Sequence, residues 1–375
     1  MQYCSKCLQP DTRPGTSFSE DGTCPSCIYY ESILKVDWEE RIEILHKIIK
    51  DYKSNNESQH DCIMGVSGGK DSTRQAIFLK ENLGLNPLLV CLSYPPDQVS
   101  EVGVNNISNL INLGFDVIIS APAPVTWKNL KIGGFNKFTN SFRSTEMALF
   151  ASVPQVAIDH QIKLIFWGEN PGLQVGDQSF LGKTGYDGNN SRYGNTLSSG
   201  FDWMKEIIKD SNKLIPYYYP SEEDFKKHEL QIIYLGWFLG DWSLLNNGLY
   251  ASTIGLSLRE DNADKTGDLY GISAIDEDHT PVNQLIKYYK FGFGKATEYV
   301  NEEIRLKRIS RNKGIRIVEE YDGRLDSNYI KNYCKYLNIT EDYFWNKIKE
   351  SLNTDLFEIN SNGNISKKFK VGYGL

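Results

Sequence analysis

The chain has 375 residues, of which 40% are hydrophobic and 24% are charged, so its composition is that of a globular protein with room for two or three domains. The 48 acidic residues outnumber the 41 basic ones and give a formal net charge of −7, which argues against sequence-independent binding to a nucleic-acid backbone. No stretch reaches the ~18 consecutive apolar residues of a membrane span, and residues 1–30 lack the apolar run of a secretory signal. We therefore expect a cytoplasmic protein, complete as written, that binds neither nucleic acid nor membrane.

Four of the seven cysteines form two closely spaced pairs near the start of the chain, Cys4 with Cys7 and Cys24 with Cys27. The resulting C-x2-C-x16-C-x2-C spacing is what two thiolate-bearing turns need to close a tetrahedral zinc site. The segment between the pairs is rich in Pro and Gly, so the metal would supply much of the folding free energy. Since four sulfurs leave no open coordination position, we expect a structural zinc ribbon over residues 1–35. The alternatives are coincidental pairs or a redox dithiol.

Beyond the ribbon, short apolar runs alternate with stretches of helical periodicity. The apolar runs predict strands over 62–66, 88–92, 116–120 and 163–167. The periodic stretches predict helices over 37–53, 72–83, 99–113 and 143–161. Strands separated by helices of this length are typical of an α/β domain with a parallel sheet, which binds its ligands at the carboxyl ends of the strands. We place this domain over residues 36–200.

The composition changes over residues 172–200, where seven glycines occur with Ser, Asn and Asp and almost no periodicity. This segment is either a mobile active-site loop or a plain disordered connection. Residues 201–375 read as mostly helical, with Asp326 and Thr340 as the N-caps of two successive helices. We expect this C-terminal region to bind the substrate or a partner.

The most informative segment is 67–72, with the sequence SGGKDS, which lies between a predicted buried strand and a helix. Its adjacent glycines let backbone N–H groups approach an anion, and the helix start, a lysine and hydroxyl groups add further donors. These features predict a phosphate-binding loop; a glycine turn without a ligand is the alternative. The segment is not a Walker A loop, because Met64 and Asp71 stand where that motif requires Gly and Ser or Thr.

SGGKDS after the first strand resembles the signature of the PP-loop ATP pyrophosphatases, which share an adenine-nucleotide α-hydrolase-like fold and cleave ATP between the α and β phosphates. The resemblance implies two catalytic roles: Lys70 neutralises the developing charge of the pyrophosphate, and Asp71 helps to hold Mg²⁺. The chemistry itself also requires donors and a cation aimed at the leaving pyrophosphate, because that group accumulates charge. The resemblance further implies an ATP-binding set made of Ser67, Gly68, Gly69, Lys70, Asp71, Ser72, Ser93 and Gly168.

An oxygen that receives AMP becomes a leaving group, so a nitrogen or sulfur nucleophile completes the reaction. Sulfur transfer ordinarily requires a persulfide cysteine or an iron–sulfur triad near the loop, whereas Cys62 and Cys91 both fall in predicted strands. Ammonia is therefore the better nucleophile, and a glutaminase should supply it because free ammonia is scarce at neutral pH. The chain has no G-x-C-x-G elbow and carries Gln2 rather than an N-terminal cysteine, so a separate glutaminase subunit is implied.

The ribbon, SGGKDS and the segment 167–171 (WGENP) together resemble the bacterial N-acetyl sugar amidotransferases of surface polysaccharide and nonulosonate biosynthesis. The resemblance extends to 290–297 (KFGFGKAT) and 303–305 (EIR), and so covers nearly the whole chain. It implies an enzyme that uses ATP and ammonia to convert an acetamido group of an activated or acidic sugar into an acetamidino group. The ammonia would come from a partner similar to the glutaminase subunit of imidazole glycerol phosphate synthase.

Candidate residues for the acceptor chemistry follow the fourth predicted strand and lie in the C-terminal region. Glu169, at the carboxyl end of a parallel strand, is placed to orient the amide or to take a proton from ammonia, and Asn170 to bind substrate. Capping before Pro171 is the alternative for both residues. The C-terminal region also has a group of basic residues, Lys290, Lys295, Arg305 and Arg311. We expect this group either to bind the acidic part of the sugar or to form a solvated helix face.

Two other classes of protein compete with this interpretation. A tRNA-thiolating PP-loop enzyme would also combine the loop with a zinc module, but the net charge of −7 and the absence of a basic, aromatic-interleaved stripe argue against it. A non-catalytic zinc-ribbon adaptor would be indifferent to ATP. Amidation of the asparagine-synthetase or NAD-synthetase kind shares the loop but usually lacks the ribbon.

Overall fold

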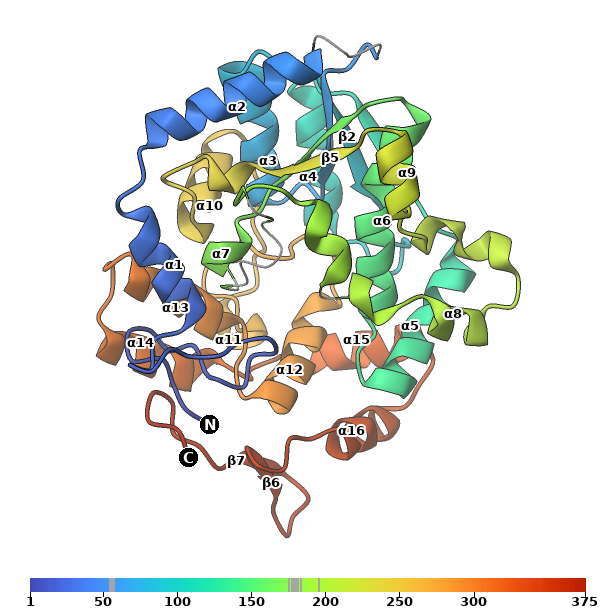
Figure 1. Cartoon of the computed structure of the whole chain (residues 1–375). Coiled ribbons are helices and arrows are strands. Elements are labelled where there is room, and N and C mark those ends of the chain that lie inside the picture. The colour runs from blue at the N-terminus through green and yellow to red at the C-terminus, as the bar shows by residue number, and fades with distance from the viewer. Residues whose placement is uncertain (54–57, 175, 177–181, 183, 195) are drawn as a thin grey trace.

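The chain is described from a computed structural model (Figure 1). The described residues are 1–53, 58–174, 176, 182, 184–194 and 196–375. They form an α/β layer around one sheet, a group of C-terminal helices, and a cysteine-rich N-terminal segment that lies against those helices (Figure 1). Among the described helices, none combines the length and the hydrophobicity that crossing a bilayer requires.

The sheet has five parallel strands in the order β3-β2-β1-β4-β5. The strands are β1 (Cys62–Val66), β2 (Pro87–Leu92), β3 (Val117–Ser120), β4 (Leu164–Trp167) and β5 (Gln231–Tyr234). The chain builds outward from β1 through β2 to β3, and then places β4 and β5 on the other side of β1. The strand order therefore reverses between β1 and β4, and open α/β sheets bind their ligands at the carboxyl ends of the strands at such a point.

Helices make up most of the rest of the described chain. The first half contributes α1 (Pro25–Ile33), α2 (Trp38–Lys53), α3 (Lys70–Ile77), α4 (Glu101–Asn112), α5 (Pro124–Phe138), α6 (Arg143–Asp159) and α7 (Pro171–Gln174). The second half contributes α8 (Asp202–Ile207), α9 (Glu222–Lys227), α10 (Leu244–Thr253), α11 (Ala263–Thr266), α12 (Thr280–Phe291), α13 (Lys295–Arg305), α14 (Arg311–Tyr321), α15 (Ser327–Leu337) and α16 (Glu341–Glu350). A small antiparallel hairpin of β6 (Phe357–Ile359) and β7 (Ile365–Lys367) follows α16.

The alternating side chains of β1 explain why helices cover both faces of the sheet. Met64 belongs to a buried cluster with residues of α2, α3 and α4. Its neighbour Ile63 belongs to a separate cluster, in which α6 contributes Val153 and Ala157. The strand is hydrophobic throughout because neither face is left to water, as the continuous apolar run predicts.

The predicted class, an α/β protein with a parallel sheet and a mostly helical C-terminal region, is confirmed. The four predicted strands match β1 to β4 within one residue at each end. The two predicted N-caps are also confirmed, since Asp326 accepts a hydrogen bond from the Asn328 N–H (2.8 Å) and Thr340 from the Tyr343 N–H (3.1 Å).

Two elements escape the sequence analysis. Helix α5 has two adjacent glycines, and β5 is a four-residue strand inside the region predicted as mostly helical. The sheet therefore uses residues beyond position 200, where we place the end of the α/β domain. The loop predicted over 172–200 includes residues 175, 177–181, 183 and 195, which lie outside the described residues. Within the described part of this loop, Asp187 forms an isolated antiparallel β-bridge with Ile233 of β5.

The N-terminal segment packs on the C-terminal helices rather than standing apart. Leu8 is fully buried against Val300 of α13 and Val318 of α14, and its backbone N–H donates to the Asn301 side chain (2.8 Å). Arg311 of α14 donates to the Cys7 carbonyl oxygen (3.3 Å). The two ends of the chain are thus joined in one core.

We predict that Gly103→Ala destabilises the protein by about 1–3 kcal/mol, as overpacking typically does. Gly103 lies on α4, where a Cβ atom would come within 2.6 Å of the Asp276 Cα and 2.7 Å of its carbonyl oxygen, both backbone atoms. Chemical denaturation measures the free energy of unfolding. The matched control is Asn105→Ala on the exposed side of the same helix, which we expect to change stability by less than about 0.5 kcal/mol. Equal stabilities of the two variants would contradict the close packing of α4 on the Asp276 segment.

Candidate active site and metal site

The segment 67–72 forms a tight turn between β1 and α3. Gly68 has a φ of +74°, and a Cβ atom there would lie 2.8 Å from the Asn106 Cβ atom, so both conformation and space require glycine. The Ser72 hydroxyl donates to the Gly69 carbonyl oxygen (3.1 Å), and the Ser67 hydroxyl oxygen accepts from the Gly69 N–H (3.4 Å). The turn therefore presents backbone amides and the start of α3 at the carboxyl edge of the sheet, as a phosphate loop does.

Lys70 and Asp71 form an ion pair of 2.6 Å at the start of α3, and the lysine is almost completely buried. The side chain of Asn247, from α10, donates to Asp71 (2.6 Å) and accepts from Arg74 (2.6 Å). Asn247 is fully buried, and Arg74 also pairs with Asp241 (2.6 Å). The second half of the chain thus fixes the orientation of the loop's carboxylate.

Glu169 follows β4, which pairs with β1, so its carboxylate lies beside the phosphate loop. By its accessible surface the residue is exposed, while the protein around it still desolvates its carboxylate in part. This desolvation, together with the negative charge of Asp71, raises the pKa of Glu169 to about 7, while Lys70 acts in the opposite direction. The carboxyl group is therefore poised to exchange a proton near neutral pH.

These groups line one cavity of about 230 Å³ at the point where the strand order reverses. Its polar end is formed by the phosphate loop and Glu169. Its apolar wall comes from β2 and α6, with Val90, Leu149 and Val153, and the segment Ile272–Asp276 of the C-terminal region closes it. A polar end joined to an apolar slot suits a nucleotide, whose phosphates and base need these two surroundings.

Most of the predicted ATP-binding residues meet in this cavity, which is lined by Ser67, Gly69, Lys70, Asp71, Ser72 and Gly168, with Gly68 inside the turn. Ser93 does not line it. Its backbone N–H bonds to Ser120 of β3, and its hydroxyl donates to the Tyr94 carbonyl oxygen (3.3 Å). The next residue, Tyr94, faces the cavity instead.

Asn170 is also placed differently from the prediction. It is 1% exposed, its amide donates to the Gly236 carbonyl oxygen (3.0 Å), and its side-chain oxygen accepts from the Leu173 N–H (3.3 Å). The side chain caps the short helix α7, as the alternative interpretation holds. Asn170 therefore supports the segment that carries Glu169 and does not line the cavity.

The four predicted basic residues do not form one patch. Lys290 donates to the Phe138 carbonyl oxygen (2.5 Å), Arg305 to the Leu173 carbonyl oxygen (3.2 Å), and Arg311 to the Cys7 carbonyl oxygen (3.3 Å). These three residues hold segments of backbone together, because unpaired carbonyl groups inside a protein need donors. Of the four, Lys295 alone lines a cavity beside the phosphate loop.

Two contributors to the site are missing from the sequence analysis. Asn247 lies 176 positions from Asp71 in an ordinary helical stretch, so nothing in the local sequence marks it. Asp276 reaches the cavity from the C-terminal region, and its pKa is raised to about 6 by burial and by the neighbouring Glu277. Tyr94 had a signal, since it lies two residues after the end of β2.

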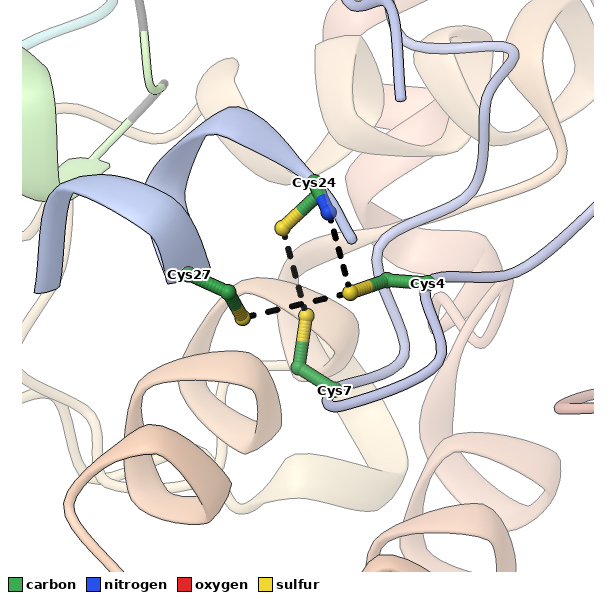
Figure 2. A group of neighbouring side chains, drawn as sticks. All are labelled: Cys4, Cys7, Cys24 and Cys27. Atoms are coloured by element: carbon green, nitrogen blue, oxygen red, sulfur yellow. Dashed lines mark hydrogen bonds between the residues drawn. The ribbon is translucent and has the colours of Figure 1, made fainter. Parts of the chain in front are cut away.

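The four predicted metal ligands come together in the structure (Figure 2). Cys4, Cys7, Cys24 and Cys27 are buried, and their sulfur atoms all lie within 4.8 Å of one another. The Cys4–Cys27 and Cys7–Cys24 sulfur distances are 3.9 and 3.7 Å, far longer than a disulfide bond of ~2 Å. Metal–sulfur bonds of ~2.3 Å in a tetrahedron separate the sulfurs by about 3.8 Å, so this geometry fits a metal ion.

Backbone N–H groups also point at these sulfurs. The Cys24 N–H donates to the Cys4 sulfur (3.2 Å), and the Lys6 N–H donates to the same atom (3.4 Å). The Gln9 N–H donates to the Cys7 sulfur (3.4 Å). Such bonds stabilise thiolates, which are the form of cysteine that binds metals.

Fold and site together define an α/β protein with a glycine-containing turn of phosphate-loop geometry at the switch point of a parallel sheet, and with four clustered cysteines whose spacing suits a metal ion. Residues 269–370 match the family model described as LPS biosynthesis protein WbpG-like, C-terminal domain. Over these residues the resemblance to a surface polysaccharide family is confirmed. No curated protein matches the chain.

Two solved structures are similar to this chain. One is the NH3-dependent NAD synthetase of Campylobacter jejuni, with 15% identity and a TM-score of 0.32, covering 58% of this chain and 84% of that chain. The other is the NMN synthetase of Francisella tularensis, with 15% identity and a TM-score of 0.27, covering 61% of this chain and 99% of that chain.

We predict that the purified protein carries one metal ion per chain and that Cys24→Ser loses it, because a fourth thiolate is required to close the site. Elemental analysis by mass spectrometry measures the metal, and thermal unfolding with and without a chelator measures its effect on stability. Cys334→Ser is the control, since Cys334 is a buried cysteine of α15 outside the cluster. Retention of a full metal complement by Cys24→Ser, or its absence from the wild-type protein, would refute the assignment.

Proposed function

We propose that this protein is the synthetase subunit of an ATP-dependent, AMP-forming amidotransferase that acts on an N-acetyl sugar in surface polysaccharide biosynthesis. The observation that carries the proposal is the convergence of the phosphate loop and Glu169 on one cavity that the C-terminal region closes. The family match over residues 269–370 supports the pathway class.

The acetamido group of the sugar is a poor electrophile and must be activated. Its carbonyl oxygen attacks the α-phosphorus of ATP, pyrophosphate leaves, and an AMP-substituted imidate forms. Ammonia then adds to the imidate carbon, AMP leaves with the former carbonyl oxygen, and loss of a proton gives the acetamidino group. The net change replaces one oxygen atom by an NH group.

The phosphate loop supports the first step. Its backbone amides and Lys70 meet the pyrophosphate, whose charge grows as the bond breaks. Mg²⁺ neutralises phosphate charge when bound, and Asp71 is suited to hold it because each carboxylate oxygen keeps a second acceptor position besides its bond to Lys70 or Asn247.

Glu169 supports the second step. Ammonia that adds to the imidate carries an excess proton, and a carboxylate with a pKa of about 7 accepts it near neutral pH. Ammonia itself would come from a separate glutaminase subunit, similar to that of imidazole glycerol phosphate synthase, because the chain has no recognisable glutaminase motif.

The cysteines near the loop favour nitrogen over sulfur as the nucleophile. Cys62 and Cys91 are buried in β1 and β2. Burial raises the pKa of Cys62 far above its ordinary value and that of Cys91 to about 12, so neither is available as a thiolate. This environment argues against the tRNA-thiolating alternative.

We propose zinc as the metal of the four-cysteine site. A set of four buried sulfurs is typical of structural zinc and leaves no position for a reacting molecule. The metal would hold the N-terminal segment against α13 and α14. Through α1, which packs on α7, it would also support the segment that follows Glu169.

Lys70→Met tests the ATP chemistry. We expect wild-type protein with ATP, Mg²⁺, ammonium and N-acetyl sugars to release AMP and pyrophosphate. The turnover rate of the variant should be lower by a factor of about 100 or more. Chromatography of the nucleotides measures both. The control is Lys80→Met, whose exposed ammonium group bonds to the carbonyl oxygens of Leu113 and Gly114. Formation of ADP, or full activity of Lys70→Met, would overturn the proposal.

The pH dependence tests Glu169. Because its pKa is raised to about 7, the carboxylate is protonated on the acid side, and we expect activity to fall as the pH drops below about 7. Glu169→Gln should lose this acid limb along with about 100-fold or more of the activity. A variant that keeps both the wild-type rate and the acid limb would exclude Glu169 as the base.

Stability gives an independent readout of the same group. A raised pKa means that the folded protein binds the proton more tightly than the unfolded chain, so this contribution to stability is present at about pH 4 and is lost as the pH rises through 7. Glu169→Gln has no carboxyl group to ionise at this position, so it does not lose this stability as the pH rises. The variant should therefore gain stability relative to wild type between pH 5 and pH 8, in thermal unfolding measurements.

A further inference from the structure

A second cavity of about 230 Å³ adjoins the first one behind the phosphate loop. The two cavities share Lys70, Asp71 and Ala274, so a group in the second cavity lies next to the phosphate loop. The C-terminal region contributes most of the polar wall, including Ser273, Thr280, Gln284 and Lys295. All four belong to the segment that matches the polysaccharide family.

Gln284 marks this cavity as a binding site. Its side-chain oxygen is buried and has no hydrogen-bond partner among the described residues. An unmade hydrogen bond of this kind costs about 1–3 kcal/mol, which a ligand bound in the cavity would recover. A ligand N–H or O–H group in the cavity would satisfy the oxygen.

Lys295 supplies the charge. Three cations surround the carboxylate of Glu298, namely Lys287 (2.8 Å), Lys295 (2.9 Å) and Arg13 (3.3 Å), and among them only Lys295 lines the cavity. Burial lowers the pKa of Lys295, but Glu298 and other nearby carboxylates more than offset this, so the ammonium group stays charged. One bond to Glu298 leaves it two N–H donors for a ligand.

The other two charges that the C-terminal region contributes to the wall are engaged within the protein. Asp268 accepts from the Tyr270 and Ser273 backbone amides (3.2 and 3.1 Å). Arg259 pairs with Asp278 (2.9 Å) and donates to the Glu277 carbonyl oxygen (2.7 Å), so it closes the cavity as a wall. Since Lys70 and Asp71 serve the nucleotide in the proposed function, Lys295 is the charged group of this wall left to recognise a ligand, and Gln284 adds an unpartnered oxygen.

We propose that this second cavity binds the acceptor: a hydroxylated N-acetyl sugar ring with an acidic group, either a ring carboxylate or an attached phosphate. Lys295 receives the acidic group, and Gln284 receives an N–H or O–H of the ring. The inference rests on the proposed function, which it deepens by placing the acceptor and naming the residues that hold it.

Direct binding to the full-length protein tests the inference without any turnover. Calorimetric titration would use N-acetylneuraminate as the carboxylate probe, UDP-N-acetylglucosamine as the phosphate probe and N-acetylglucosamine as the neutral probe. We expect wild-type protein to bind one acidic probe at least tenfold more tightly than the neutral one, and the preferred acidic probe identifies the source of the charge. Failure of both acidic probes to bind would overturn the inference.

Two variants and a matched control separate recognition from packing. Lys295→Met and Lys287→Met each remove one cation from Glu298, but only Lys295 lines the cavity. We therefore expect Lys295→Met, and not Lys287→Met, to weaken binding of the acidic probe tenfold or more. Gln284→Leu should weaken it as well, without lowering the midpoint of thermal unfolding, because its oxygen has no protein partner to lose. Equal losses for the two lysine variants would overturn the inference. Because ATP is absent, these outcomes are independent of whether the enzyme forms AMP.

Discussion

The pairing of β1 with β4 decides what this chain is able to do. It sets the phosphate loop after one strand beside Glu169 after the other, at the single place in the sheet where the strand order reverses. Both segments are short continuations of buried strands, so their positions follow from the hydrophobic core rather than from a flexible loop. A carboxylate with a raised pKa then stands next to donors that suit a growing negative charge. In the function we propose, activation of an oxygen and deprotonation of the incoming nitrogen are two tasks of one cavity.

The C-terminal half of the chain completes this site instead of forming a separate module. Asn247 holds Asp71 in place, and the segment near Asp276 closes the cavity beside the loop. The four cysteines tie the start of the chain to α13 and α14, which lie far away in sequence. The four-cysteine site therefore connects the two ends of the chain. The family match fits this arrangement of the site, because the matching segment contributes the wall against which an acceptor would lie.

The sequence predicts much of the fold because its signals are local. The strands are continuous apolar runs, SGGKDS is contiguous, and the cysteine pairs carry their own spacing. Asn247 and the two-cavity arrangement depend on contacts between residues more than 100 positions apart, which no local pattern reports. Arg305 and Arg311 illustrate the opposite error. Their charge suggested an anion site, whereas their guanidinium groups serve backbone carbonyl oxygens. A basic residue in an acidic protein can equally well be needed for internal hydrogen bonds.

The central claim is that the carbonyl oxygen of an acetamido group is transferred to AMP. An acceptor sugar labelled with ¹⁸O in its acetamido carbonyl tests this most directly, with the nucleotide products analysed by mass spectrometry after incubation with ATP, Mg²⁺ and ammonium. The account predicts that the label appears in the phosphate of AMP and that the sugar gains nitrogen in its place. Unlabelled AMP, or label retained in the sugar while the nucleotide becomes ADP, would contradict it.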